Sequence, residues 1–195
     1  MINLNMLLDR RAITGLLALF VVGACGDDTG TNWPRPSEPL ELSVYDIVEG
    51  PVDRASALNV VAGAGSGFPI TARVDVTQQW DMAFGMIDGE PYWLPRGFFE
   101  GLEPTAGILE MEQDFDEINT APDDRTLYEY NDPLLMTEGN TYIIRSRNDP
   151  TTELPCRIFA KLRVEAIQPD PAWMQFVILW NPNCDDTNLT LGTTE

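Results

Sequence analysis

The sequence contains no histidine, and this absence excludes several kinds of active site. Ser-His-Asp and Cys-His nucleophilic systems need an imidazole as their base, and the usual zinc hydrolases need one as a metal ligand. Basic residues are also scarce, with 12 lysines and arginines against 31 aspartates and glutamates and a net charge of −19. Because such a surface repels phosphate backbones, nucleic-acid binding is not expected.

Patterns typical of other enzymes and binding sites are incomplete in this chain. The glycines of "GAGSG" (63–67) lack the spacing of a dinucleotide-binding loop, so we interpret this segment as a flexible loop tip. The segment "DFDEINTAPDD" (114–124) lacks the glycine and terminal glutamate of a calcium loop, which leaves a solvated acidic loop as the alternative to a calcium site. Carboxylate pairs are numerous, but no spacing selects one pair for glycoside hydrolysis. We therefore expect the protein not to be an enzyme.

Long apolar runs are missing too. The segment "AITGLLALFVVGAC" (12–25) holds about a dozen largely apolar residues, whereas a membrane-spanning helix needs about 20. It follows Arg10 and Arg11, so residues 1–24 are predicted to be a signal peptide. The run ends on Val-Gly-Ala-Cys, which resembles the bacterial lipobox and implies lipidation of Cys25. An ordinary secretory signal is the alternative.

The residues after Cys25 are rich in Gly, Pro, Ser, Thr and acidic side chains, so residues 25–39 are predicted to form a flexible acidic tether. The acidic pair at its start is similar to the surface-export signal of some bacterial lipoproteins. The expected location is therefore the outer membrane, with a lipid anchor and the domain facing the periplasm or the cell surface. Residues 40–188 are enough for one domain with its own core, and 189–195 are predicted to be a disordered tail.

The domain is predicted to be all-β, a single antiparallel domain with few or no helices. In "IFAKLRVEAI" the apolar residues alternate with Lys161, Arg163 and Glu165, a period of two that is typical of a half-solvated antiparallel strand. The only helical candidate is a turn or two within 109–118. The predicted strands are short, rich in Val, Ile and aromatic residues, and separated by Gly, Pro and Asp clusters; they cover 41–48, 70–84, 141–147, 157–167 and 173–180.

Two cysteines remain besides Cys25. Cys156 and Cys184 each lie 14 positions from residue 170, in the middle of a turn with two prolines, so a hairpin folded about that turn brings them together. In an oxidising compartment they are predicted to form a disulfide. A metal site is the alternative, but two thiols without histidine are too few ligands.

Four segments in order resemble the HmuY-type haem-binding lipoproteins. Members of that family carry a Trp-Asp-x-Ala-Phe strand, an Asp-Phe-Asp loop before a proline, an extended Tyr-x-x-Arg strand and a Tyr-Ala-Lys-Leu-Arg-Val strand. The resemblance implies an all-β domain that clasps haem and passes it to an outer-membrane uptake receptor. The matching segments here are "WDMAF" (80–84), "QDFDEINTAP" (113–122), "YIIRSRN" (142–148) and "FAKLRV" (159–164).

The chain departs from that family at the position next to the Trp-Asp strand. Where bis-histidine members carry a ligand, this sequence has Gly85 followed by Met86. Thioether sulfur is a known axial ligand of haem iron, so Met86 is the first candidate ligand and Met111 or Met136 the second. The alternative is that these methionines fill the core, as buried methionines commonly do.

The segment "PYWLPRGFFEG" (91–101) is predicted to be an aromatic loop that either closes one end of the domain or lines a ligand. If a porphyrin binds, Tyr92 and Trp93 would pack on it, together with Phe98 and Phe99, and Arg96 would pair with a propionate.

Two functions are therefore considered: a haem or porphyrin carrier with methionine ligands, or an accessory lipoprotein of the same fold that binds a protein partner. In both, the alternation of side chains predicts that Trp80, Met82 and Phe84 share one buried face, with Asp81 and Ala83 on the other. The carrier hypothesis also requires a strand break at Gly85, where the missing β-carbon would let Met86 turn out of the core.

Overall fold

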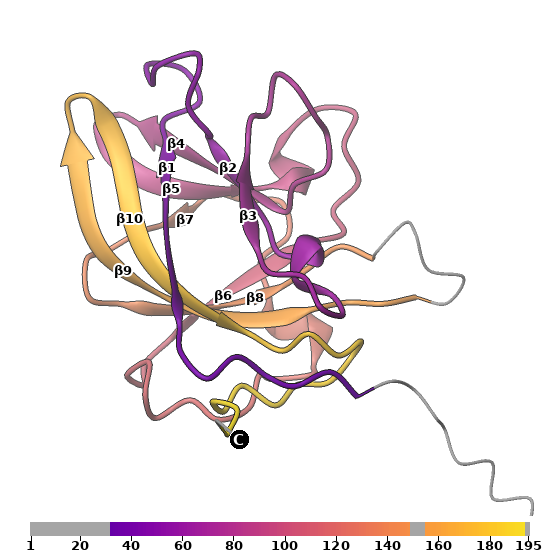
Figure 1. The fold of residues 1–195 in the computed structure, drawn as a ribbon. Coiled ribbons are helices and arrows are strands. Elements are labelled where there is room, and N and C mark those ends of the chain that lie inside the picture. The colour runs from indigo at the N-terminus through magenta and orange to yellow at the C-terminus, as the bar shows by residue number, and fades with distance from the viewer. Residues whose placement is uncertain (1–31, 149–154, 194–195) are drawn as a thin grey trace, which may run out of the picture. The chain divides into compact units, whose positions relative to one another are not determined.

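The computed structural model describes residues 32–148 and 155–193, and within them the chain forms ten strands in two antiparallel sheets (Figure 1). This confirms the predicted all-β class. The predicted signal peptide, Cys25 and the tether up to residue 31 lie outside the described residues. Within the described ranges, no helix has the length and apolar character needed to cross a membrane.

The two sheets have five strands each. The first sheet has the order β1 (Leu40–Tyr45), β10 (Ala172–Trp180), β9 (Phe159–Pro169), β8 (Thr141–Arg145) and β6 (Gly107–Met111). The second has the order β3 (Ile70–Ala72), β2 (Ala57–Asn59), β4 (Met82–Ile87), β5 (Glu90–Pro95) and β7 (Leu134–Leu135). Three single 3-10 turns accompany them: η1 (Val61–Gly63), η2 (Arg96–Phe98) and η3 (Arg125–Leu127).

Four of the five predicted strands are present, with ends shifted by no more than three residues. The fifth prediction, 70–84, is wrong because this stretch is interrupted: β3 ends at Ala72 and β4 begins at Met82. Between them the amide of Thr77 donates to the carbonyl of Arg73 at 3.2 Å, which makes a turn. The valine and threonine residues of this stretch favour a strand, but the hydrogen-bonded turn interrupts it.

The helical candidate at 109–118 is also wrong, because its first part belongs to β6. Ile108 packs in the core between the sheets, whereas Leu109 and Met111 pack in a cluster on the outer face of the first sheet. The segment then turns, with the amide of Glu117 donating to the carbonyl of Asp114 at 3.0 Å.

The core between the sheets is built from alternate residues of both. Ile158, Ala160, Leu162 and Val164 face it as the alternation predicts, but beyond them Ile167 packs against the core in place of the predicted Ala166. Near its centre the indole of Trp93 makes edge-on contacts with two phenylalanine rings, Phe84 on β4 and Phe176 on β10.

The opposite face of β9 is less solvated than predicted, because Lys161 is buried there. Its ammonium donates to the carbonyls of Phe115 at 2.7 Å and Ile118 at 2.8 Å and lies 4.6 Å from the centre of the Phe115 ring. Burial lowers the pKa of Lys161, an effect that the carboxylate of Asp116 opposes. The acidic segment predicted to be a solvated loop is thus held against the sheet by this lysine, together with the packing of Ile118 and Ala121 on the same face.

The C-terminal segment covers the same outer face. Leu189 is buried there, although residues 189–195 were predicted to be a disordered tail. Its amide donates to the carbonyl of Asn119 at 2.9 Å, and the amide of Gly192 donates to the carbonyl of Pro36 at 2.8 Å. The latter bond also ties down part of the predicted tether, whose described residues begin at 32.

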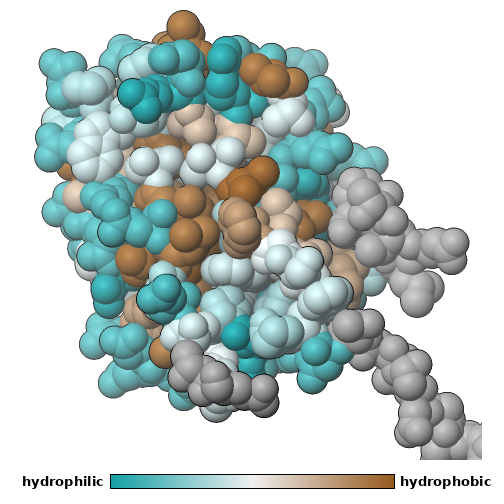
Figure 2. Space-filling view, viewed as in Figure 1, coloured by the Kyte–Doolittle hydropathy of each residue, from teal (hydrophilic) through white to brown (hydrophobic). Residues whose placement is uncertain are grey.

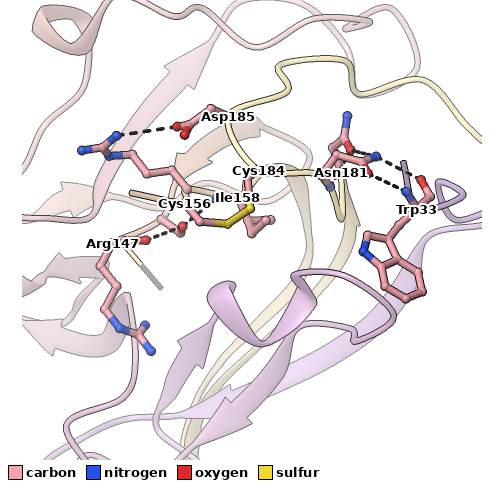
Figure 3. Close-up of a disulfide and its surroundings, with 10 residues drawn as sticks. Trp33, Arg147, Cys156, Ile158, Asn181, Cys184 and Asp185 are labelled. Atoms are coloured by element: carbon pink, nitrogen blue, oxygen red, sulfur yellow. Dashed lines mark hydrogen bonds and ion pairs between the residues drawn. A yellow bond between two sulfur atoms is a disulfide. The ribbon is translucent and has the colours of Figure 1, made fainter. Parts of the chain in front are cut away.

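The predicted disulfide is present, with sulfur atoms of Cys156 and Cys184 2.00 Å apart. Figure 3 shows it joining the segment before β9 to the segment after β10. The pairing of Ala160 with Trp180 has the same register as Cys156 with Cys184, because the positions of each pair sum to 340. A bulge between Gln175 and Phe176 shifts the register nearer the turn, but it leaves the open end of the hairpin as predicted.

Candidate functional site

The segment "WDMAF" crosses from a loop into β4, and its side chains only partly follow the predicted alternation. Met82 and Phe84 are in the core between the sheets, and Ala83 faces the outer side of the second sheet, as expected. Trp80 is buried as predicted, but on the outer face with Ala83. Its predicted side is wrong because the extended pairing of β4 starts only at Met82, so alternation does not run back through Asp81.

Met86 lies inside a continuous strand. β4 pairs with β5 through Gly85 and Tyr92 and then through Met86 and Pro91, so the break that the carrier hypothesis requires at Gly85 is absent. The amide of Met86 donates to the buried carboxylate of Asp46 at 2.6 Å, and its side chain packs half-buried against the central core. A β-carbon at position 85 would come within 2.8 Å of Leu94, so glycine here serves close packing.

The two candidate partners of Met86 lie in different places. Met136 is 2% exposed in the same core, and its amide donates to the carbonyl of Pro91 at 2.8 Å. Met86 and Met136 thus flank Pro91 within one sheet rather than facing each other across a slot. Met111 packs in the cluster on the outer face of the other sheet, and the structure does not bring it together with Met86.

The predicted aromatic loop is strand β5 followed by η2. Trp93 is fully buried in the central core, while Tyr92 packs in the outer cluster of the second sheet. Arg96 lies 5.2 Å from the centre of the Trp80 ring and donates to the carbonyls of Gln78 at 2.6 Å and Trp80 at 3.0 Å. Its guanidinium therefore holds the chain that leads into β4.

A buried polar group, unrecognised in the sequence, lies where this chain meets the end of β2. The carboxylate of Asp81 accepts hydrogen bonds from the amides of Val60 at 2.6 Å and Arg147 at 2.9 Å. One guanidinium nitrogen of Arg147 is 3.0 Å from the same carboxylate, and another donates to the side chain of Asn59 at 3.3 Å. We call Asp81, Arg147 and Asn59 the Asp81 hub. Both charged residues stand inside recognised segments, but sequence gave no sign that they pair.

A second buried aspartate fixes the connection between β1 and β2. Asp46 accepts from the amides of Val48 at 2.8 Å and Glu49 at 2.5 Å, as well as from Met86. The loop it organises carries Val48 and Val52, which are 81% and 85% exposed.

A third exposed valine lies on the neighbouring connection. Val76, in the loop between β3 and β4, is 69% exposed. Figure 1 shows both loops projecting from the same end of the domain, and Figure 2 shows isolated hydrophobic residues among hydrophilic ones at that end. We call Val48, Val52 and Val76 the valine surface.

A polar hollow lies between the chain before β1 and the C-terminal segment; it is lined by residues that include Trp33, Arg35, Asn183, Asp186 and Asn188. The side chain of Asn183 accepts from the amide of Trp33 at 2.6 Å and donates to its carbonyl at 3.0 Å. These polar groups thus hold the entering chain against the domain. Among the residues that the structure describes, no three His, Cys, Asp or Glu side chains are grouped as a metal site.

The Asp81 hub yields a stability prediction. Asp81→Asn removes the negative charge beside the buried guanidinium of Arg147, so we expect a loss of about 3 to 5 kcal/mol in the free energy of unfolding. Urea unfolding followed by tryptophan fluorescence measures it. The matched control is Asp75→Asn, which breaks an exposed pair with Arg73 and should change little. Equal effects of the two substitutions would contradict a structural role for the hub.

Comparison with known proteins does not extend this description. No family model matches the chain. No curated protein and no solved structure matches it either.

Proposed function

We propose that this protein is a lipid-anchored protein of the bacterial envelope whose β-sandwich binds a protein partner through the valine surface. The observation that carries the proposal is the exposure of Val48 and Val52 on a loop held by the buried Asp46. Apolar side chains on an ordered loop can be buried by a partner without the entropic cost of first ordering that loop. This favours the accessory lipoprotein over the carrier.

The charge of the chain indicates the kind of partner. With a net charge of −19, the protein attracts a surface with basic residues around an apolar centre and repels acidic ones. Glu49 and Asp53 are exposed on the same loop as the two valines. The partner expected here is therefore a protein with an apolar patch and a basic rim.

Photo-crosslinking tests the valine surface. A photoreactive amino acid placed singly at positions 48, 52 and 76 in cells should give adducts of one common mass. The same residue at position 127 is the control, because Leu127 is 52% exposed but lies on η3, away from both loops. Adducts that are the same at position 127, or absent at all three valine positions, would rule the surface out.

The anchor is a separate prediction, since Cys25 lies outside the described residues. The Val-Gly-Ala-Cys segment supports lipidation at Cys25, which would hold the chain to a membrane through its acyl chains. Cys25→Ala should move the protein from the membrane fraction to the soluble fraction, and an antibody to the domain measures this by fractionation. Unchanged membrane association would count against the lipobox.

Haem binding is the second candidate, and the observation that favours it is that Met86 and Met136 pack in one core. Its difficulty is the continuous strand at Gly85, which keeps Met86 directed towards the core.

A haemin titration decides between the two functions. For the accessory lipoprotein we expect no change in the Soret band in either oxidation state. Ligation by Met86 would instead give a haemin-dependent Soret band that Met86→Ala abolishes. Met111→Ala is the matched control, because Met111 lies in another cluster and its removal should leave such a band intact. A band that survives both substitutions would exclude ligation by Met86.

A further inference from the structure

Two arginines lie beside the buried carboxylate of Asp81. Arg147 is 8% exposed and pairs with Asp81 from the segment after β8. Arg96 reaches the same region from η2, where it donates to the carbonyl of Trp80, the residue before Asp81. Burial lowers the pKa of Arg96, and the positive charge of Arg147 lowers it further, while Asp81 and Glu103 oppose this.

The donors of this group are not all used. Within the described residues, Nε of Arg96, Nη1 of Arg147 and Nε1 of Trp80 are buried and donate to no acceptor. Nη1 of Arg147 is 3.0 Å from Asp81 but makes no aligned hydrogen bond there. The ring of Trp80 makes a T-shaped contact with the ring of Phe99, and we rest the inference on the two guanidinium donors.

Near Asp81 the arginines outnumber the carboxylates that pair with them, whereas the chain as a whole is acidic. Among the described residues, Arg147 pairs with one buried carboxylate, that of Asp81. No carboxylate of these residues lies within ion-pairing distance of Arg96. Glu103 is exposed. Buried charges are normally paired, and buried donors normally find an acceptor such as a protein atom, an ordered water or an ion. Arg96 as a residue is half-buried, but its Nε is buried, and neither this donor nor Nη1 of Arg147 has an acceptor among the described residues.

We propose that a small monoanion, either chloride or a carboxylate group, binds between Arg96 and Arg147 next to Asp81. A single anion would accept from the unused guanidinium donors, which favour carboxylates and other anions through charge-assisted hydrogen bonds. The inference is independent of the partner bound by the valine surface, because it involves none of the residues of that surface.

Thermal unfolding at constant ionic strength tests the proposal. Replacing sodium gluconate, whose anion is much bulkier than chloride or acetate, by sodium chloride or sodium acetate should raise the melting temperature of the wild type by about 3 °C. A rise with chloride alone identifies a halide site, and a rise with acetate identifies a carboxylate site. The rise should vanish in Arg96→Gln. It should persist in Arg163→Gln, the matched control, whose arginine is half-exposed and paired with Glu165 at 2.8 Å.

A direct measurement covers the case in which Arg96→Gln does not fold. Wild-type crystals soaked in sodium bromide should give an anomalous peak within hydrogen-bonding distance of Nε of Arg96 or Nη1 of Arg147 if the site takes halide. Acetate should suppress that peak in competition if the site prefers a carboxylate. The proposal is overturned if no peak forms and the wild type melts at the same temperature in all three salts.

Discussion

The carboxylate of Asp81 is the interaction on which the second sheet depends. It sits at the start of β4, where its own amide donates to the carbonyl of Leu58 at 2.7 Å, and it accepts amides from the turn after β2 and from the chain after β8. Two segments far apart in sequence are thereby fixed to the strand that carries Met82 and Phe84 into the core. A buried charge of this kind is stabilising only while its partners stay in place, which makes the hub more a determinant of geometry than a source of stability.

Polar anchors of the same type recur where irregular chain is held against a sheet. Asp46 joins the end of β1 to β4 through the amide of Met86, and the amide of Ile47 donates to the carbonyl of Phe84 at 3.1 Å, so the two sheets are connected at this corner. Lys161 performs the equivalent task on the first sheet by using carbonyls as acceptors. Each anchor lets a long irregular connection keep a fixed path, which a loop of acidic residues would not do alone.

Features that repeat along one strand, or that lie symmetrically about one turn, were predictable from the sequence. Alternation in β9 and equal spacing of Cys156 and Cys184 about one turn are local patterns, and the structure bears out the core face of the strand and the disulfide. The predictions failed where contacts between residues far apart in the sequence determine the structure. Trp80 left its predicted face because Asp81 bonds across the sheet, and Lys161 was predicted to be solvated although carbonyls 43 to 46 positions away bury it. Four strands were missed. β2 and β7 have three and two residues, too few to show a period, whereas β5 was predicted to be a loop and the last part of β6 a helical turn.

The direction of β1 has a consequence for how the domain is presented. The chain is clamped before β1 by the bonds between Trp33 and Asn183, and the loop with the exposed valines follows the other end of the strand (Figures 1 and 3). The six extended residues of β1, which lie between those points, span about 20 Å. A pull on the chain ahead of Trp33 is therefore received by the clamp and by the C-terminal segment bonded to it. The loop with the exposed valines lies beyond both the clamp and β1, so such a pull would reach it last.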